Sequence, residues 1–155
     1  MGNHNFYTNG GEPQVEKPYA GDISPAQAWE ILAQEKNSIL VDVRTPGEWS
    51  FIGYPDLSSL SKNVHFISWR LSPNMEINED FVLQVLKEVK LDKNDKVLLL
   101  CRSGGRSRDA AIAMTSMGFK QCYNIEGGFE GEINETGHRG AKNGWKACNL
   151  PWEQR

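Results

Sequence analysis

One cysteine stands among arginines and glycines in the segment Leu100-Cys101-Arg102-Ser103-Gly104-Gly105-Arg106-Ser107. Cys101 follows the apolar run Val97–Leu100, and the glycines after it free the backbone to curl. Such a curl can turn several N–H groups toward one centre, and a helix starting behind it adds the positive end of its dipole. Together with the charges of Arg102 and Arg106, these features stabilise a thiolate over a thiol. The segment predicts a nucleophilic sulfur with an anionic substrate or adduct.

The other cysteines offer no rival site. Cys122 lies in an apolar run and is expected in the core, and Cys148 lies in a late loop. Three cysteines without a Cys-x-x-Cys spacing argue against a disulfide framework and against a zinc site. We therefore expect free thiols, no metal and no cofactor.

Simpler and competing interpretations of the cysteine loop are weaker. A structural cysteine beside a glycine turn explains the apolar run but leaves the arginines unexplained. Nothing ties His65 or His138 to Cys101 as the base of a cysteine hydrolase. The phosphate-binding pattern Gly-x-x-x-x-Gly-Lys-Ser/Thr is absent.

The elements around Cys101 predict an α/β fold. Apolar runs at 39–43, 97–100 and 122–125 suit strands buried on both faces. Three helices are expected. The first begins after Ser24, which can cap it while the Gln27 side chain reaches back in a capping box; the second covers 78–89 with Asn78 as its cap, and the third covers 107–117. The alternation predicts a small parallel sheet with helices on both faces, and Cys101 then lies at the carboxyl end of a strand, where ligands bind in such sheets.

Composition limits the class of protein. The chain has 155 residues, a net charge of −3 and 39% hydrophobic residues, enough for one domain with a core. This balance predicts no nucleic-acid or membrane partner, and the absence of a signal pattern at the amino terminus predicts a cytoplasmic protein. Residues 1–20 are expected to be a disordered tail and residues 21–155 a single domain.

Two motifs in order resemble the rhodanese-like sulfurtransferases. The Cys101–Arg106 segment is similar to that family's active-site loop, and Asp42-Val43-Arg44-Thr45-Pro46-Gly47-Glu48-Trp49 is similar to its upstream signature. Gly127-Gly128-Phe129 and the ending Leu150-Pro151-Trp152 are similar to its carboxyl-terminal pattern. The segment Tyr54-Pro55 and the segment Val64–Trp69 depart from the family pattern near the site entrance, which puts substrate preference in doubt.

The resemblance implies a rhodanese-like fold and a mechanism. Cys101 would take sulfane sulfur from thiosulfate or a related persulfide donor, and a thiol, cyanide or a protein would then accept it. The implied substrate-binding residues form the loop itself: Arg102, Ser103, Gly104, Gly105, Arg106 and Ser107. Asp42, Arg44 and Glu48 would support the loop, and we expect an ion pair between Arg44 and Glu48.

Two alternatives stay open. Some phosphatases share the rhodanese fold, but their cysteine loop is one residue longer than the four residues between Cys101 and Arg106. A persulfide carrier or regulatory binding module would keep the same loop without free turnover.

The stretch 130–146, longer than a minimal domain needs, could form a lid or hairpin beside the loop or cover an edge.

Overall fold

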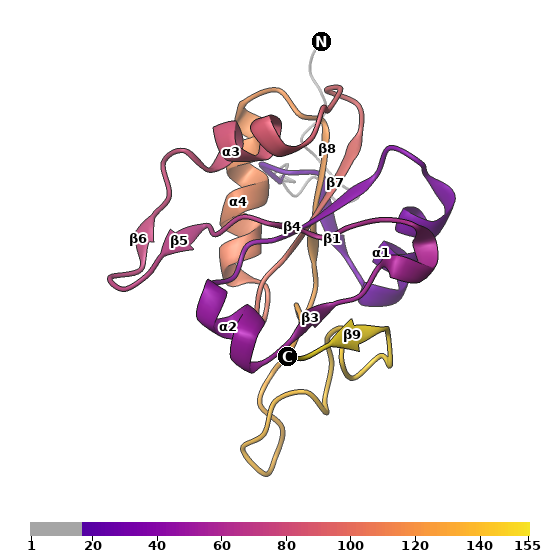
Figure 1. Cartoon of the computed structure of the whole chain (residues 1–155), viewed down its shortest axis with the longest axis vertical. Coiled ribbons are helices and arrows are strands. Elements are labelled where there is room, and N and C mark those ends of the chain that lie inside the picture. Colours follow the sequence, from indigo (N-terminus) through magenta and orange to yellow (C-terminus); the bar gives the residue numbers. More distant parts are fainter. Residues whose placement is uncertain (1–16) are drawn as a thin grey trace, which may run out of the picture.

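The centre of the molecule is a sheet of five strands in the order β1-β8-β7-β2-β4, seen in a computed structural model that describes residues 17–155 (Figure 1). All four strand pairs are parallel. The strands are β1 (Gly21–Ile23), β2 (Ile39–Asp42), β4 (His65–Phe66), β7 (Lys96–Leu100) and β8 (Gln121–Ile125). The predicted parallel α/β fold is confirmed.

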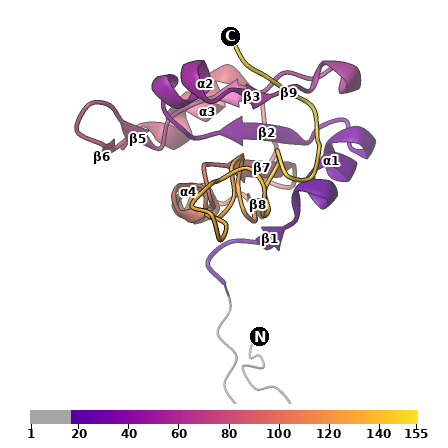
Figure 2. The ribbon, with the colours of Figure 1, turned by 90° about the horizontal axis from the view of Figure 1, so that it is seen from below.

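Helices cover both faces of this sheet, as the sequence predicts. On one face lie α3 (Phe81–Glu88) and α4 (Gly105–Ser116), and on the other lies α1 (Pro25–Gln34) (Figure 2). The short helix α2 (Pro46–Phe51) follows β2. Smaller elements complete the chain: the antiparallel pairs of β3 (Tyr54–Pro55) with β9 (Trp152–Glu153) and β5 (Arg70–Leu71) with β6 (Glu76–Ile77), and the 3-10 turn Ser58–Leu60.

Alternate strand residues divide the core in two. Val41 and Leu99 pack on the side of α3 and α4, whereas Leu40 and Leu98 pack on the side of α1. Because both faces are covered, nearly every position of the central strands is apolar. Cys122 is fully buried in the first of these clusters, which confirms its expected place in the core.

Helix boundaries follow local hydrogen bonds. Ser24 and Gln27 form the predicted capping box of α1. The prediction that Asn78 caps α3 is wrong, because α3 begins later, at Phe81. The Asn78 Oδ1 accepts from the Asp80 N–H and its Nδ2 donates to the Ser68 carbonyl, so its side chain stabilises the turn before the helix. The helix expected from residue 107 starts at Gly105, because Gly104 with φ +121° closes the loop sooner.

The amino-terminal segment holds a strand that the sequence did not predict. Strand β1 pairs with β8, and before it Tyr19 is buried while the Ala20 N–H donates to the Cys122 carbonyl. Residues 17–20, assigned to the predicted tail, therefore belong to the fold. The rest of that predicted tail, residues 1–16, lies outside the described residues.

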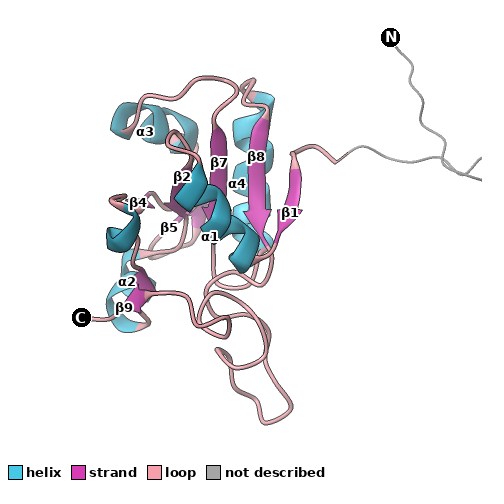
Figure 3. Cartoon of the chain, turned by 90° about the vertical axis from the view of Figure 1, so that its right-hand side faces the viewer, coloured by secondary structure: helices cyan, strands magenta, loops and turns pink. Residues whose placement is uncertain are grey.

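Beyond the carboxyl ends of the strands, residues 126–151 form irregular loops (Figure 3). The stretch 130–146 contains no strand pair, so the hairpin, one of the possibilities left open for it, is not formed. Within it the Glu132 N–H donates to Asn143 Oδ1, and Trp145 is fully buried against the α1 side of the sheet. No helix among residues 17–155 has the length and apolar character needed to cross a membrane.

Candidate active site

Cys101 lies directly after β7 and before the first turn of α4, as predicted. Its side chain is 1% exposed, and its Sγ accepts hydrogen bonds from the Gly104 N–H and the Ser107 hydroxyl, both at 3.1 Å. The amino terminus of α4 begins behind it, so the helix dipole also favours negative charge on the sulfur. The geometry suits a thiolate or another anionic sulfur.

The Gly127-Gly128-Phe129 motif and the residues after it are hydrogen-bonded to the backbone of the cysteine loop. The Phe129 N–H donates to the Cys101 carbonyl at 2.8 Å, and the N–H groups of residues 130 and 131 donate to the Arg102 carbonyl. A Cβ on Gly128 would lie 2.4 Å from the Cys101 carbonyl oxygen, and its φ is +57°. Only glycine fits there, because two backbones touch at a left-handed position.

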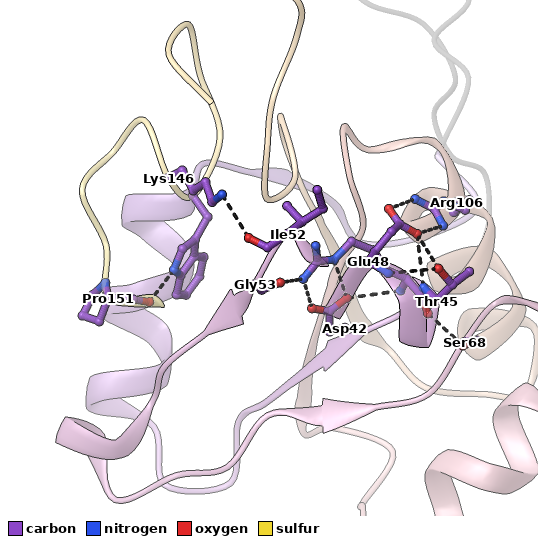
Figure 4. Close-up of polar contacts among 11 residues, drawn as sticks. Asp42, Thr45, Glu48, Ile52, Gly53, Ser68, Arg106, Lys146 and Pro151 are labelled. Atoms are coloured by element: carbon purple, nitrogen blue, oxygen red, sulfur yellow. Dashed lines mark hydrogen bonds and ion pairs between the residues drawn. The ribbon is translucent and has the colours of Figure 1, made fainter. Parts of the chain in front are cut away.

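Arg106 binds Glu48 through two parallel contacts of 2.7 and 2.8 Å (Figure 4). Glu48 also accepts from the N–H and hydroxyl of Thr45, the cap of α2. Burial raises the pKa of Glu48, but the hydrogen bonds and charge of Arg106, together with Thr45, outweigh it and leave the pKa below its usual value. The ion pair clamps α2 to the start of α4.

The expected ion pair between Arg44 and Glu48 is wrong. Arg44 instead binds Asp42 at 2.7 and 3.0 Å, with both side chains fully buried, and donates to the Gly53 carbonyl (Figure 4). Its guanidinium lies 4.3 Å from the centre of the Phe129 ring. Asp42 and Arg44 are two residues apart and so reach each other locally, which leaves Glu48 to pair with the more distant Arg106.

The loop's remaining side chains divide into rim and interior. Arg102 and Ser103 are exposed, and Arg102 forms no side-chain hydrogen bond or ion pair with the residues that the structure describes. Ser107 is fully buried, and its hydroxyl contacts both the Cys101 sulfur and Asn124 Oδ1. Sequence reasoning missed Asn124 and its partner Asp22; the signal was a polar residue inside the apolar run 122–125.

Other groups weighed from the sequence lie away from the sulfur. Burial raises the pKa of Cys122 to about 11, which opposes reactivity, and Cys148 is exposed. The ring of His65 contacts Glu88, and that of His138 contacts Thr136. A surface pocket of about 590 Å³, lined by residues that include Trp49, Tyr54 and Phe66, occupies the region that departs from the family pattern but contains no residue of the cysteine loop.

Comparison with known proteins decides the family. A family model described as the STR4 middle domain matches residues 20–155. Thiosulfate sulfurtransferase GlpE of Actinobacillus pleuropneumoniae is 29% identical over 132 residues, covering 85% of this chain and 92% of that protein. The chain is a rhodanese-like protein of the STR4 middle domain family. The predicted membership of the rhodanese-like sulfurtransferases is thus confirmed.

Two further relatives match this rhodanese-like protein over most of its length. The crystal structure of Rv0390 from M. tuberculosis superposes with a TM-score of 0.80 at 44% identity, covering 88% of this chain and 99% of that one. The uncharacterized protein RC0915 of Rickettsia conorii is 40% identical over 132 residues, covering 85% of this chain and 96% of its own length. The fold and the family are therefore shared by proteins of similar size.

Proposed function

We propose that this rhodanese-like protein is a sulfurtransferase that carries sulfane sulfur on Cys101. The observation that carries the proposal is the Cys101 sulfur, which receives a backbone N–H and a hydroxyl at the start of a helix. Such donors stabilise the anionic sulfur of both the resting enzyme and a persulfide. Thiosulfate is the donor we favour, because the relative GlpE bears that substrate in its name.

The reaction has two displacement steps. The Cys101 thiolate attacks the outer sulfur of thiosulfate; a new sulfur–sulfur bond forms, the original one breaks, and sulfite leaves with its electron pair. A thiol or cyanide then attacks the outer sulfur of the persulfide and releases the thiolate. With cyanide the product is thiocyanate, and neither step needs an added oxidant or reductant. This is covalent catalysis, in which Cys101 holds the sulfur between the two steps.

Arg102 and Arg106 have different roles, because only Arg106 is engaged in an ion pair with the residues that the structure describes. Arg102, exposed at the rim, attracts the anionic donor. Arg106 was expected to do the same, but its guanidinium is held by Glu48, so its larger role is to fix the loop.

The test is the mass of the protein after incubation with thiosulfate. We expect one added sulfur atom, released sulfite in equal amount, and loss of the added sulfur on addition of cyanide. Cys101→Ser should abolish the adduct, whereas Cys122→Ser and Cys148→Ser should retain it. An adduct on another cysteine would refute the assignment. Adduct formation without turnover by cyanide would indicate a carrier, and hydrolysis of an aryl phosphate without an adduct would indicate a phosphatase.

A further inference from the structure

A chain of polar contacts runs from the Cys101 sulfur across the sheet to β1. Ser107 on α4 contacts the sulfur at 3.1 Å and also contacts Asn124 Oδ1 on β8. The Asn124 Nδ2 donates to Asp22 Oδ1 on β1 at 3.0 Å. Ser107 is fully buried and Asn124 is 5% exposed, so water does not replace the contacts of Ser107, whereas the side chain of Asp22 is 25% exposed. The proposed chemistry of Cys101 does not use the last two members of this chain.

Asp22 decides which way the Asn124 amide faces. It accepts from Asn124 Nδ2, from the Tyr19 hydroxyl at 2.9 Å and from the Lys17 ammonium at 2.8 Å. Burial raises the pKa of Asp22, but these three donors outweigh it and leave the pKa below its usual value. An ionised carboxylate only accepts, so the amide nitrogen must face Asp22 and the amide oxygen must face Ser107.

The Ser107 hydroxyl has one proton and two acceptors. Donated to the sulfur, that proton stabilises a thiolate or persulfide anion; donated to Asn124 Oδ1, it leaves the hydroxyl oxygen to accept from a neutral thiol. The two arrangements therefore belong to the two protonation states of Cys101. The acceptor strength at position 124 sets the balance between them.

We propose that Asn124, oriented by Asp22, is a positioning residue that sets how readily Ser107 gives its proton to the Cys101 sulfur. A neutral amide is a weak enough acceptor to hold the hydroxyl in place yet release its proton to an anionic sulfur. The inference rests on Cys101 being the nucleophile. It assigns a function to two residues outside the cysteine loop, on the strands β8 and β1.

Several charged groups lie near the contacts that join Ser107, Asn124 and Asp22. They are the Arg106–Glu48 ion pair, whose guanidinium interacts with the charges of Cys101 and Asp42, and the Lys17–Asp22 ion pair, with Glu126 near Lys17 and Arg108 near Tyr19. Apart from the one member exchanged in a variant, all of them stay in place during the test below. A change in sulfur reactivity can therefore be assigned to positions 22 and 124.

The decisive variant exchanges the two side chains, Asp22→Asn with Asn124→Asp. It keeps the net charge and keeps an amide facing a carboxylate, but it places the stronger acceptor against Ser107. The measurement is the rate at which iodoacetamide alkylates Cys101, followed by peptide mass over a range of pH. Near neutral pH we expect alkylation about tenfold slower than in the natural chain, the factor for one charge-assisted hydrogen bond, and a midpoint shifted to higher pH.

A matched control and a second variant complete the test. Gln121→Glu makes the same amide-to-carboxylate change at the far end of β8 and should leave the alkylation rate unchanged. Asp22→Asn alone lets Asn124 turn its nitrogen to Ser107, which directs the hydroxyl proton to the sulfur, so alkylation should become faster. This second variant decides the question if the exchanged protein does not fold.

The outcomes separate a positioning role from a structural one. If Asn124 and Asp22 only join β8 to β1, the folded exchanged variant alkylates at a rate within about fivefold of the natural chain, and the proposal is overturned. With the exchanged variant unfolded, an unchanged or slower rate for Asp22→Asn overturns it. Alkylation does not require sulfur transfer, so failure of the natural chain to form a persulfide would refute the proposed function and leave this result standing on its own.

Discussion

The ion pair between Glu48 and Arg106 should contribute measurably to stability, and Glu48→Gln is the perturbation that tests it. The glutamine keeps the size of the side chain, and its oxygen can still accept from Thr45 and from one Arg106 nitrogen. Its NH₂ group, however, meets the second Arg106 nitrogen at the position of a 2.8 Å contact. A donor then faces a donor, and one charge-assisted hydrogen bond is lost.

The magnitude follows from burial. A hydrogen bond to a charged group contributes about 1.5–3 kcal/mol when water is excluded. The two side chains are 21% and 18% exposed, so water competes in part, and we expect Glu48→Gln to lower the free energy of unfolding by about 1–2 kcal/mol. For a domain of this size that corresponds to a melting temperature lower by roughly 2–8 °C.

The assay is denaturant unfolding of four proteins: the natural chain, Glu48→Gln, Arg106→Gln and the double variant. The two single losses should not add, because they remove the same contact. Since the folded pKa of Glu48 lies below its ordinary value of 4.5, its contribution is complete above that pH and disappears as the pH falls through the folded pKa. Additive losses from the two single variants would refute the reasoning. So would a difference in the free energy of unfolding between the natural chain and Glu48→Gln that persists unchanged into strong acid.

Three further changes have defined outcomes. Gly128→Ala should abolish persulfide formation and lower the melting temperature, because its Cβ would meet a carbonyl oxygen at 2.4 Å; Gly47→Ala, whose added Cβ would have only Thr45 Oγ1 nearby among the described residues, at 4.0 Å, is the control for both measurements. Asp42→Asn should cost about 3–5 kcal/mol in urea unfolding, since it leaves a buried guanidinium without its counter-ion; a loss below about 1 kcal/mol would contradict this. Phe81→Ala should cost about 3–5 kcal/mol by the same measurement, and the exposed Leu83→Ala almost nothing; equal losses would show that α3 does not pack as described.

Local patterns in the sequence were sufficient for the fold class and for the place of Cys101 in the fold. Strands that are apolar throughout indicate a sheet covered on both faces, because only full burial removes the need for polar positions. The cysteine after such a strand, followed by glycines and a helix, must lie at the carboxyl end of the sheet. The capping box at Ser24 likewise follows from residues three apart. Each of these inferences depends on neighbours in the chain.

Partners that lie far apart in the sequence were decided only by the tertiary structure. Glu48 could have paired with Arg44, four residues away, but Asp42 and Arg44 are buried together and leave Glu48 to Arg106, 58 positions further along. The contact of Asn124 with Asp22 joins residues 102 positions apart and exists only because β1 adds to the edge of the sheet beside β8. Three residues of β1 carry too little pattern to predict a strand; pairing with β8 and the burial of Tyr19 make it one. Sequence therefore determined where the cysteine and its loop lie, and packing determined which charges and amides surround them, because the energy of a buried ion pair or hydrogen bond depends on what the fold brings within reach.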